Sequence, residues 1–213
     1  TCGSDLVDDE CGVCGGDGIA DGACDCDGNV DLGCGCGAAG PSGCDNECGS
    51  TAELDECGVC EGDGPLEGYT CDGTPLLFTY NASTLQAFYY FSAVMIDGVY
   101  IDSTDWVGAF NGDICVGSNQ WDTSLCNSGI CEIPIMGDSG SNETDGYMQT
   151  GDIPSFKIYD SSMDAYYDAV PSEDLTWINM QLRTISTLKA SIVLSGCTDP
   201  DYCNYDPSAT EDD

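Results

Sequence analysis

The sequence predicts a mainly β protein, in which an antiparallel β-sandwich (immunoglobulin-like or jelly-roll-like) lies between an irregular disulfide-rich region and a small cysteine-containing tail. Three observations predict this class. Cysteines are dense up to residue 75, short apolar segments alternate with turn residues over 76–195, and Cys, Pro and Asp return at 196–213. We therefore expect three parts with the boundaries 1–75, 76–195 and 196–213.

The first part, residues 1–75, has no Lys or Arg, many Gly and no aromatic residue before Tyr69. Such a segment cannot bury enough apolar surface to fold by core packing alone. Disulfides, each contributing about 2–4 kcal/mol, must therefore hold it together. The candidate cysteines are Cys2, Cys11, Cys14, Cys24, Cys26, Cys34, Cys36, Cys44, Cys48, Cys57, Cys60 and Cys71.

The second part, residues 76–195, carries short β-branched and aromatic segments separated by turn dipeptides such as Asp97-Gly98 and Asn111-Gly112. An Asn-Gly pair between apolar runs is a strong hairpin signal. About ten strands in roughly 120 residues favour an antiparallel sandwich. The expected strands are LLFTY, QAFYYFSAVMI, VYI, DWVGAF, DICVG, ICEIPIM, SFKIYD, AYYDAV, WINMQL and STLKASIVL. Pairs expected to alternate toward the core are Trp106 with Phe110, Phe156 with Ile158, and Ile192 with Leu194.

The remaining cysteines complete the disulfide prediction. Cys126 and Cys131 are close enough in sequence to close a loop, which leaves Cys115 as a buried thiol of the sandwich. Cys197 and Cys203 belong to the tail. Because the total of 17 is odd, at least one cysteine is free or bonded to another chain.

Composition limits both location and chemistry. Cysteine at this density is typical of an oxidising compartment, so we expect a secreted, extracellular or cell-surface protein. We expect this chain to be a mature or excised piece of a precursor. A net charge of −36 argues against nucleic-acid binding and against docking on anionic lipid. No apolar run reaches the length of about 18 residues needed to span a membrane. The absence of His removes Ser-His-Asp catalysis and His-ligated zinc, so we expect no enzyme.

So many carboxylates oppose compaction unless a cation neutralises them, and Asp-rich loops suit Ca²⁺. The stretch CDCDGNVD at 24–31 alternates acids as calcium loops often do, although Val30 and Cys36 stand where an EF-hand needs Gly and Glu. The candidate calcium ligands are Asp17, Asp21, Asp25, Asp27, Asn29, Asp31 and Asp63. The alternative is an acidic surface that is simply soluble. A second cation could sit among the oxygens of Asp102, Asp105, Asn111 and Asp113, with a charged hairpin rim as the alternative.

A ten-residue phrase occurs twice, as DECGVCGGDG at 9–18 and as DECGVCEGDG at 55–64. Its C-x-x-C spacing is compatible with a redox pair or half of a zinc site. No helix is predicted nearby, and neither His nor a basic residue is present to stabilise thiolates. We therefore favour a tight turn whose two cysteines bond to different partners.

This phrase resembles the cysteine-rich region of ADAMTS proteases and papilin, and more strongly the repeats of large secreted surface proteins of aquatic bacteria. In those repeats the β-domain contains a stretch similar to DWVGAFNGDICVG, here 105–117, and a third module is similar to the tail GCTDPDYCNYDPSATEDD. The resemblance implies architecture and no protease chemistry, since the similar segment of the proteases is non-catalytic. That tail module continues with Gly-Ser-Cys, whereas this chain stops at Asp213.

Cys2 of a second copy placed after Asp213 would supply the cysteine that the tail module lacks. This predicts association of the chain with copies of itself, head to tail, the alternative being an excerpt of a longer array. Strand addition at an open sheet edge would also join copies, with LLFTY and ASIVL as the exchanged segments.

Two further features bear on partners. Asn81 and Asn142 begin N-glycosylation sequons in expected surface loops. Trp106, Trp121, Trp177 and the Tyr89-Tyr90 pair could form a sugar-stacking platform, although aromatic residues of a sandwich more often lie in its core. The sequence thus predicts a non-enzymatic extracellular structural protein, a repeating subunit of a filament or surface fibre stabilised by disulfides and calcium. The alternative is a carbohydrate-binding or adhesin module with glycans as partners.

Overall fold

The computed structural model describes residues 6–126 and 129–192, and its contacts divide the chain between Thr74 and Pro75 into two compact units. We call the first the crosslinked unit and the second the β unit, and we describe each by itself. The expected tail at 196–213 lies outside the described residues, as do Cys2, Cys197, Cys203 and Leu194.

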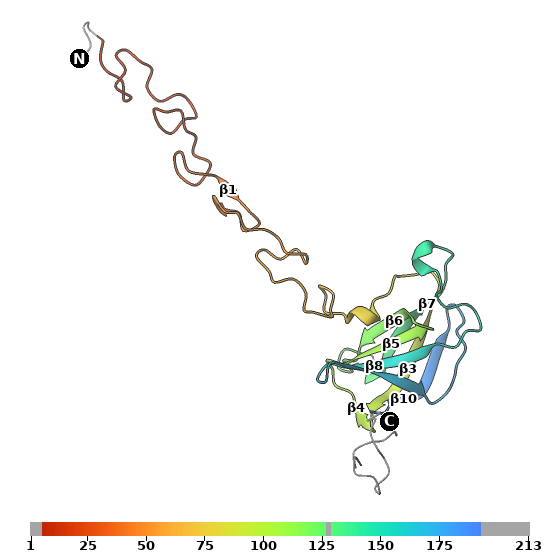
Figure 1. The fold of residues 1–213 in the computed structure, drawn as a ribbon. Helices are drawn as coiled ribbons and strands as arrows, with labels where there is room; N and C mark the ends of the chain where they lie inside the picture. The colour runs from red at the N-terminus through yellow and green to blue at the C-terminus, as the bar shows by residue number, and fades with distance from the viewer. Residues whose placement is uncertain (1–5, 127–128, 193–213) are drawn as a thin grey trace, which may run out of the picture. The chain divides into compact units, whose positions relative to one another are not determined.

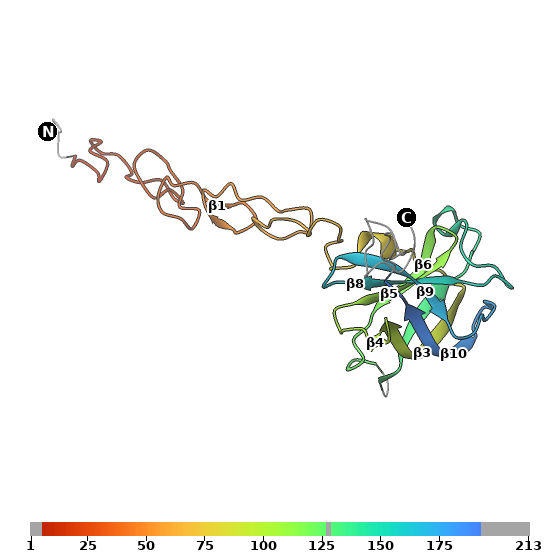
Figure 2. The same ribbon diagram turned by 60° about the horizontal axis from the view of Figure 1, so that its bottom comes forward.

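The crosslinked unit is a succession of loops, coloured red to yellow in Figures 1 and 2. Its regular structure is one small antiparallel pair, β1 (Pro41–Ser42) and β2 (Glu47–Cys48). Among residues 6–74, Ala52 is the one buried side chain. The unit therefore has no hydrophobic core, as its composition predicts.

The β unit is built on one mixed eight-stranded sheet (Figures 1 and 2). Seven strands follow the order β4-β3-β10-β9-β8-β5-β6, and the eighth, β7, pairs with β3. The predicted mainly β class is confirmed, but the two packed sheets of a sandwich are not, because the strands all belong to one sheet. The strands are β3 (Gln86–Ile96), β4 (Val99–Tyr100), β5 (Trp106–Asn111), β6 (Ile114–Gln120), β7 (Cys131–Met136), β8 (Ser155–Asp160), β9 (Ala165–Pro171) and β10 (Leu182–Ala190). Two short 3₁₀ helices are η1 (Leu76–Phe78) and η3 (Asn142–Thr144).

The long strand β3 organises this sheet. One of its edges pairs in parallel with β10, and the other pairs antiparallel with β7 up to Phe91 and with β4 from Met95. On both strands the alternation of buried and exposed residues slips by one position, after Phe91 on β3 and after Ile185 on β10. Because the slip occurs on both strands, their apolar side chains stay on the same face of the sheet. Because β10 follows almost a hundred residues after β3, this parallel pairing has no local signal in the sequence.

The sheet curls until β6 lies beside β7. The Asn119 side chain donates a hydrogen bond to the Glu132 carbonyl across this seam, at 2.9 Å. A Cβ atom at Gly117 would lie 1.9 Å from the Pro134 carbonyl oxygen, so only glycine allows the two backbones this approach. Pro134 has no N–H to donate, which agrees with the absence of a regular ladder between these two strands.

The curled sheet encloses one core. Phe91 packs edge-on against both Trp121 and Phe156, with ring centroids 6.1 and 5.2 Å apart. Trp177 is buried and donates its indole N–H to the Ile135 carbonyl at 3.0 Å. The predicted inward pair of Phe156 and Ile158 lies in this core. On β5 the prediction was wrong, because Val107 and Ala109 face the core, whereas Phe110 is buried on the opposite face against Phe78 and Trp106 is partly buried.

Two predicted strands are absent, and this changes the expected route of strand exchange. The segment LLFTY begins with η1, which packs Phe78 against Phe110 and Tyr166, outside the main core. The segment WINMQL is a turn that ends in β10. The segment ASIVL begins at Ala190, where β10 lies between β3 and β9 and is hydrogen-bonded on both sides. LLFTY is therefore not an edge strand and Ala190 does not lie at an edge, whereas Val193 and Leu194 lie outside the described residues. The described residues thus do not support exchange of these two segments between copies.

Candidate functional site: the crosslinked acidic loops

Five disulfides crosslink the described part of the first unit, and each closes a loop of 12 to 16 residues. Every loop begins before the preceding loop has ended, so consecutive loops overlap. The pairs are Cys11–Cys26, Cys24–Cys36, Cys34–Cys48, Cys44–Cys60 and Cys57–Cys71. Cys14 is disulfide-bonded as well. We call residues 11–71 with these five disulfides the disulfide ladder.

The repeated phrase folds into the same loop twice. One carboxylate oxygen of Asp55 accepts hydrogen bonds from the backbone N–H groups of Cys57 and Val59, at 2.9 and 2.7 Å, and the other accepts from Gly64 at 2.9 Å. Asp9 accepts from the three matching N–H groups at 3.0, 2.7 and 2.9 Å. The C-x-x-C motif is therefore a turn organised by one aspartate, and its cysteines bond to different partners.

Glycine is required inside this loop for two reasons. Gly58 has a φ of +76°, a conformation that residues with a side chain rarely adopt. A Cβ atom at Gly62 would lie 2.1 Å from the Asp55 carboxylate oxygen, and one at Gly16 would lie 2.2 Å from that of Asp9. The aspartate thus occupies the space that a side chain at these glycines would need.

The same turn occurs at two further places where the sequence shows no repeat. Asp25 accepts backbone hydrogen bonds from the residues two and four positions later, Asp27 and Asn29. Thr70 takes the aspartate position in the last loop, where its hydroxyl accepts the N–H of Thr74. A glycine of positive φ stands three residues after the capping residue in each case. The crosslinked unit is therefore more repetitive in structure than in sequence.

These hydrogen bonds change the acidity of the capping carboxyls. The pKa of Asp55 is lowered chiefly by the Val59 N–H, and that of Asp9 chiefly by Val13, because the donors stabilise the ionised form. For Asp25 the main cause is the Asn29 side chain, which donates to the carboxylate at 2.6 Å. For Asp31 it is the Gly33 N–H. Each of these carboxyls thus favours its charged form while it holds a turn.

The predicted calcium ligands lie on the surface of the crosslinked unit. The Asn29 side chain donates a hydrogen bond to Asp25, and Asp31 accepts hydrogen bonds from the N–H groups of Gly33 and Gly35 within its own loop. Within the described part of the chain, no three carboxylates come within 4.8 Å of one another. The remaining candidates, all exposed, are Asp17, Asp21, Asp27 and Asp63.

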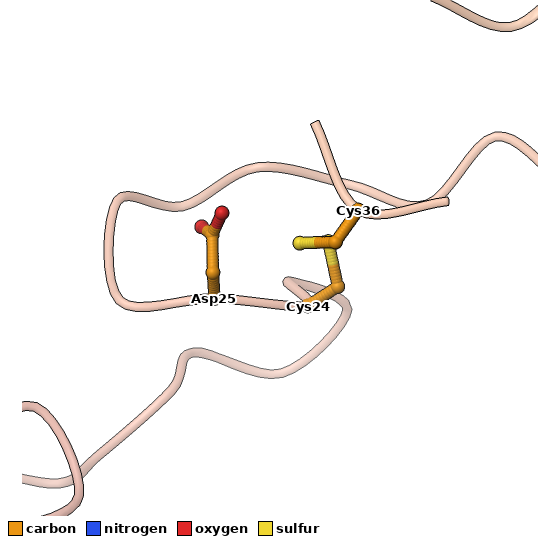
Figure 3. A group of neighbouring side chains, drawn as sticks. All are labelled: Cys24, Asp25 and Cys36. Carbon is orange, nitrogen blue, oxygen red and sulfur yellow. A yellow bond between two sulfur atoms is a disulfide. The ribbon is translucent and has the colours of Figure 1, made fainter. Parts of the chain in front are cut away.

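One group of possible metal-binding atoms does gather, at Cys24, Asp25 and Cys36 (Figure 3). The two sulfur atoms are bonded to each other in a disulfide, so neither is a thiolate. The Asp25 carboxylate already accepts hydrogen bonds from Asn29 and Asp27. The group offers a metal one carboxylate and no thiolate ligand, and it does not make a metal centre.

In the β unit, the oxygens considered for a second cation organise loops instead. Asp105 is buried and accepts hydrogen bonds from Ser161 and from the Asp102 N–H. The Asn111 side chain donates to the Gly146 carbonyl, and Asp113 is exposed at the β5–β6 turn. These residues are not brought together around a common point among the described residues.

The aromatic residues considered for sugar stacking are mostly core residues. Trp121 and Trp177 are buried, at 4 and 1% exposed, and Tyr89 is fully buried. Trp106 is partly buried on β5. A platform of exposed tryptophans is therefore absent from the described surface.

The two sequons lie close together in the β unit, since the Asn81 side chain donates to the Glu143 carbonyl, one residue after Asn142. Both asparagines are exposed. Cys126 and Cys131 form a disulfide. Cys115 is a free and buried thiol whose pKa burial raises to about 11.

The residues that hold the crosslinked loops are not the ones that the sequence first suggests. Asp9 and Asp55 each organise a loop, whereas the predicted ligands Asp17 and Asp63 are exposed residues of the same loops. The signal was present in the sequence, because an aspartate followed three residues later by glycine recurs at 9, 25 and 55. Such spacing is typical of a turn that a carboxylate caps.

The fold and the site together define a disulfide-rich, mainly β protein. No family model, no curated protein and no solved structure matches the chain. No helix among residues 6–126 and 129–192 combines the length and the hydropathy needed to cross a membrane.

Proposed function

We propose that this chain is a non-enzymatic extracellular structural protein, which copies of itself join head to tail into a filament or surface fibre. The observation that carries the proposal is the disulfide ladder: five overlapping crosslinks in a segment with almost no buried side chain. Such a segment depends on an oxidising compartment for its disulfides, and it provides length without a hydrophobic core.

Open sheet edges contribute little to the assembly that we propose. The exposed edge strand β4 has two residues, and short edge strands resist pairing with another chain. In the assembly that we propose, copies join head to tail through their end segments. These ends lie outside the described residues, so the sequence alone supports this step.

Electron microscopy of the purified protein, with gels run with and without reductant, tests this assembly. We expect filaments, and bands larger than a monomer that disappear on reduction. Cys115→Ser is the matched control, because this buried thiol is not expected to bridge copies. Monodisperse particles with a monomer band in both gels would refute the proposal.

Calcium is the second part of the proposal. The crosslinked unit contains no basic residue, so its exposed carboxylates repel one another, and Ca²⁺ at Asp17, Asp21, Asp27 and Asp63 would reduce this repulsion. A ligand that binds only the native state raises its stability. We expect the melting midpoint to fall when a chelator removes Ca²⁺ and to recover on its return. An unchanged midpoint would remove calcium from the proposal and leave the assembly untouched.

A further inference from the structure

The overlap of the loops determines how the crosslinked unit responds to tension. A pulling force that enters at Cys11 crosses its disulfide to Cys26 and travels two residues back to Cys24, where the next disulfide begins. The later steps between disulfides are two, four and three residues long, from Cys36 to Cys34, Cys48 to Cys44 and Cys60 to Cys57. Every residue from 11 to 71 lies inside at least one closed loop, and the slack backbone of each loop carries no load.

The length limit follows from this path. The five disulfides span 5.3 to 5.6 Å between Cα atoms. With the short backbone steps between them, the path from Cys11 to Cys71 cannot exceed about 65 Å at roughly 3.4 Å per residue. The same segment without disulfides extends to about 200 Å. The disulfides of the ladder therefore prevent about 140 Å of extension, even when the non-covalent structure of the segment is lost.

The overlap also protects against the loss of a crosslink. If Cys34–Cys48 opens, the load passes directly from Cys36 to Cys44 through eight residues of backbone, about 27 Å, which is nearly the length of the path that it replaces. The other two interior disulfides behave similarly, with gains below about 10 Å. The terminal disulfide Cys57–Cys71 has no loop beyond it among the described residues, and its loss adds about 20 Å.

We propose that the disulfide ladder is a load-bearing tether that keeps its length when any one interior disulfide is broken. The β unit provides the contrast. Its described disulfide closes only a five-residue span, from Cys126 to Cys131, so most of its backbone lengthens when the sheet unfolds. Under tension the sheet yields and the ladder does not. The inference rests on the proposed structural function for its purpose, but it concerns a property of the single chain.

Single-molecule pulling between handles fused to the two ends of the full chain tests the tether. We expect the oxidised chain to show the unfolding of the β unit alone, and full reduction to add at least about 140 Å of contour length. The oxidised double variant Cys34→Ser/Cys48→Ser should match the wild type within about 10 Å. The matched variant Cys57→Ser/Cys71→Ser should be longer by about 20 Å.

Two results would overturn the tether: a gain on reduction well below about 100 Å, or an interior variant that lengthens as much as the terminal one. The comparison of the oxidised with the reduced wild-type chain needs no substitution, so it tests the tether even if the cysteines of a variant pair wrongly. Mass spectrometry of the unreduced wild-type digest checks the five pairs independently, and a different connectivity also overturns the inference. Because single molecules are pulled, failure to form filaments leaves these outcomes unchanged.

Discussion

Removal of the Phe78 side chain should destabilise the β unit far more than removal of its neighbour Leu76. Phe78 is fully buried, and its ring meets those of Phe110 and Tyr166 edge-on, at centroid distances of 5.9 and 5.4 Å. Gly108 lies under it, where a Cβ atom would come within 2.8 Å of the ring. Phe78 therefore fills the space that the absence of a side chain at Gly108 leaves open.

A Phe→Ala change at such a site costs about 3–5 kcal/mol, since the transfer free energy is lost and a cavity remains. For a unit of this size, with roughly 3 °C per kcal/mol, Phe78→Ala should lower Tm by about 10–15 °C. Leu76 is 54% exposed, so Leu76→Ala should change stability by less than about 0.5 kcal/mol.

Thermal unfolding followed by tryptophan fluorescence reports on the β unit alone, because the three tryptophans lie in it. The prediction depends on η1 packing as a helical plug in place of the strand that the sequence suggests. If the two variants shifted Tm equally, η1 would not be docked, and the argument from burial would fail.

Four other predictions concern contacts elsewhere in the chain. Asp55→Ala should speed amide exchange at Val59, whereas the exposed Asp63→Ala should not, as NMR of both variants would show; equal protection would contradict the capping role. In the wild type, the Val59 amide chemical shift should titrate with the Asp55 carboxyl, whose pKa is lowered in the folded state. The loop therefore has this stabilisation above the unfolded pKa of 3.8 and loses it as the pH falls through the lower folded pKa. A titration midpoint at or above 3.8 would contradict the prediction. Cys115 should resist iodoacetamide at pH 8 until the chain unfolds, because burial raises its pKa to about 11, and peptide mapping of a native labelling reaction that found it alkylated would refute this. Gly117→Ala should destabilise the β unit by about 1–3 kcal/mol in chemical denaturation, since the new methyl group meets the Pro134 backbone; an unchanged midpoint would mean that the seam is open.

Local sequence patterns were enough to predict strands such as β3 and β8. The aromatic run of β3 and the alternation in β8 mark half-buried strands because each depends on its own side chains. The turn at Asp97-Gly98 was equally local, since both residues have positive φ. The sequence could not show that β3 pairs in parallel with β10, because nothing near either strand specifies a partner so distant along the chain.

The misread segments show where local propensity loses to packing. LLFTY has the composition of a strand, but Phe78 is buried more completely by the hollow over Gly108 than an edge strand could bury it. WINMQL is apolar because Trp177 inserts into the core from a turn and meets Gly137, where a Cβ atom would lie 2.4 Å from the indole. Tertiary contacts decided both segments, and these contacts are visible only in the folded chain.

The crosslinked unit differs because all its determinants are local. Among its cysteines in chain order from Cys11, four bond to the third one downstream, beginning with Cys11–Cys26 and ending with Cys44–Cys60. A loop of 12 to 16 residues closes at small entropic cost, and the aspartate turns shorten the distance that each thiol must search. Each crosslink can therefore form without the rest of the unit, in contrast to the β unit, whose long-range pairings must form together. A unit that folds loop by loop can be lengthened by adding loops, and this explains why the DECGVC phrase recurs in a segment that has so little to bury.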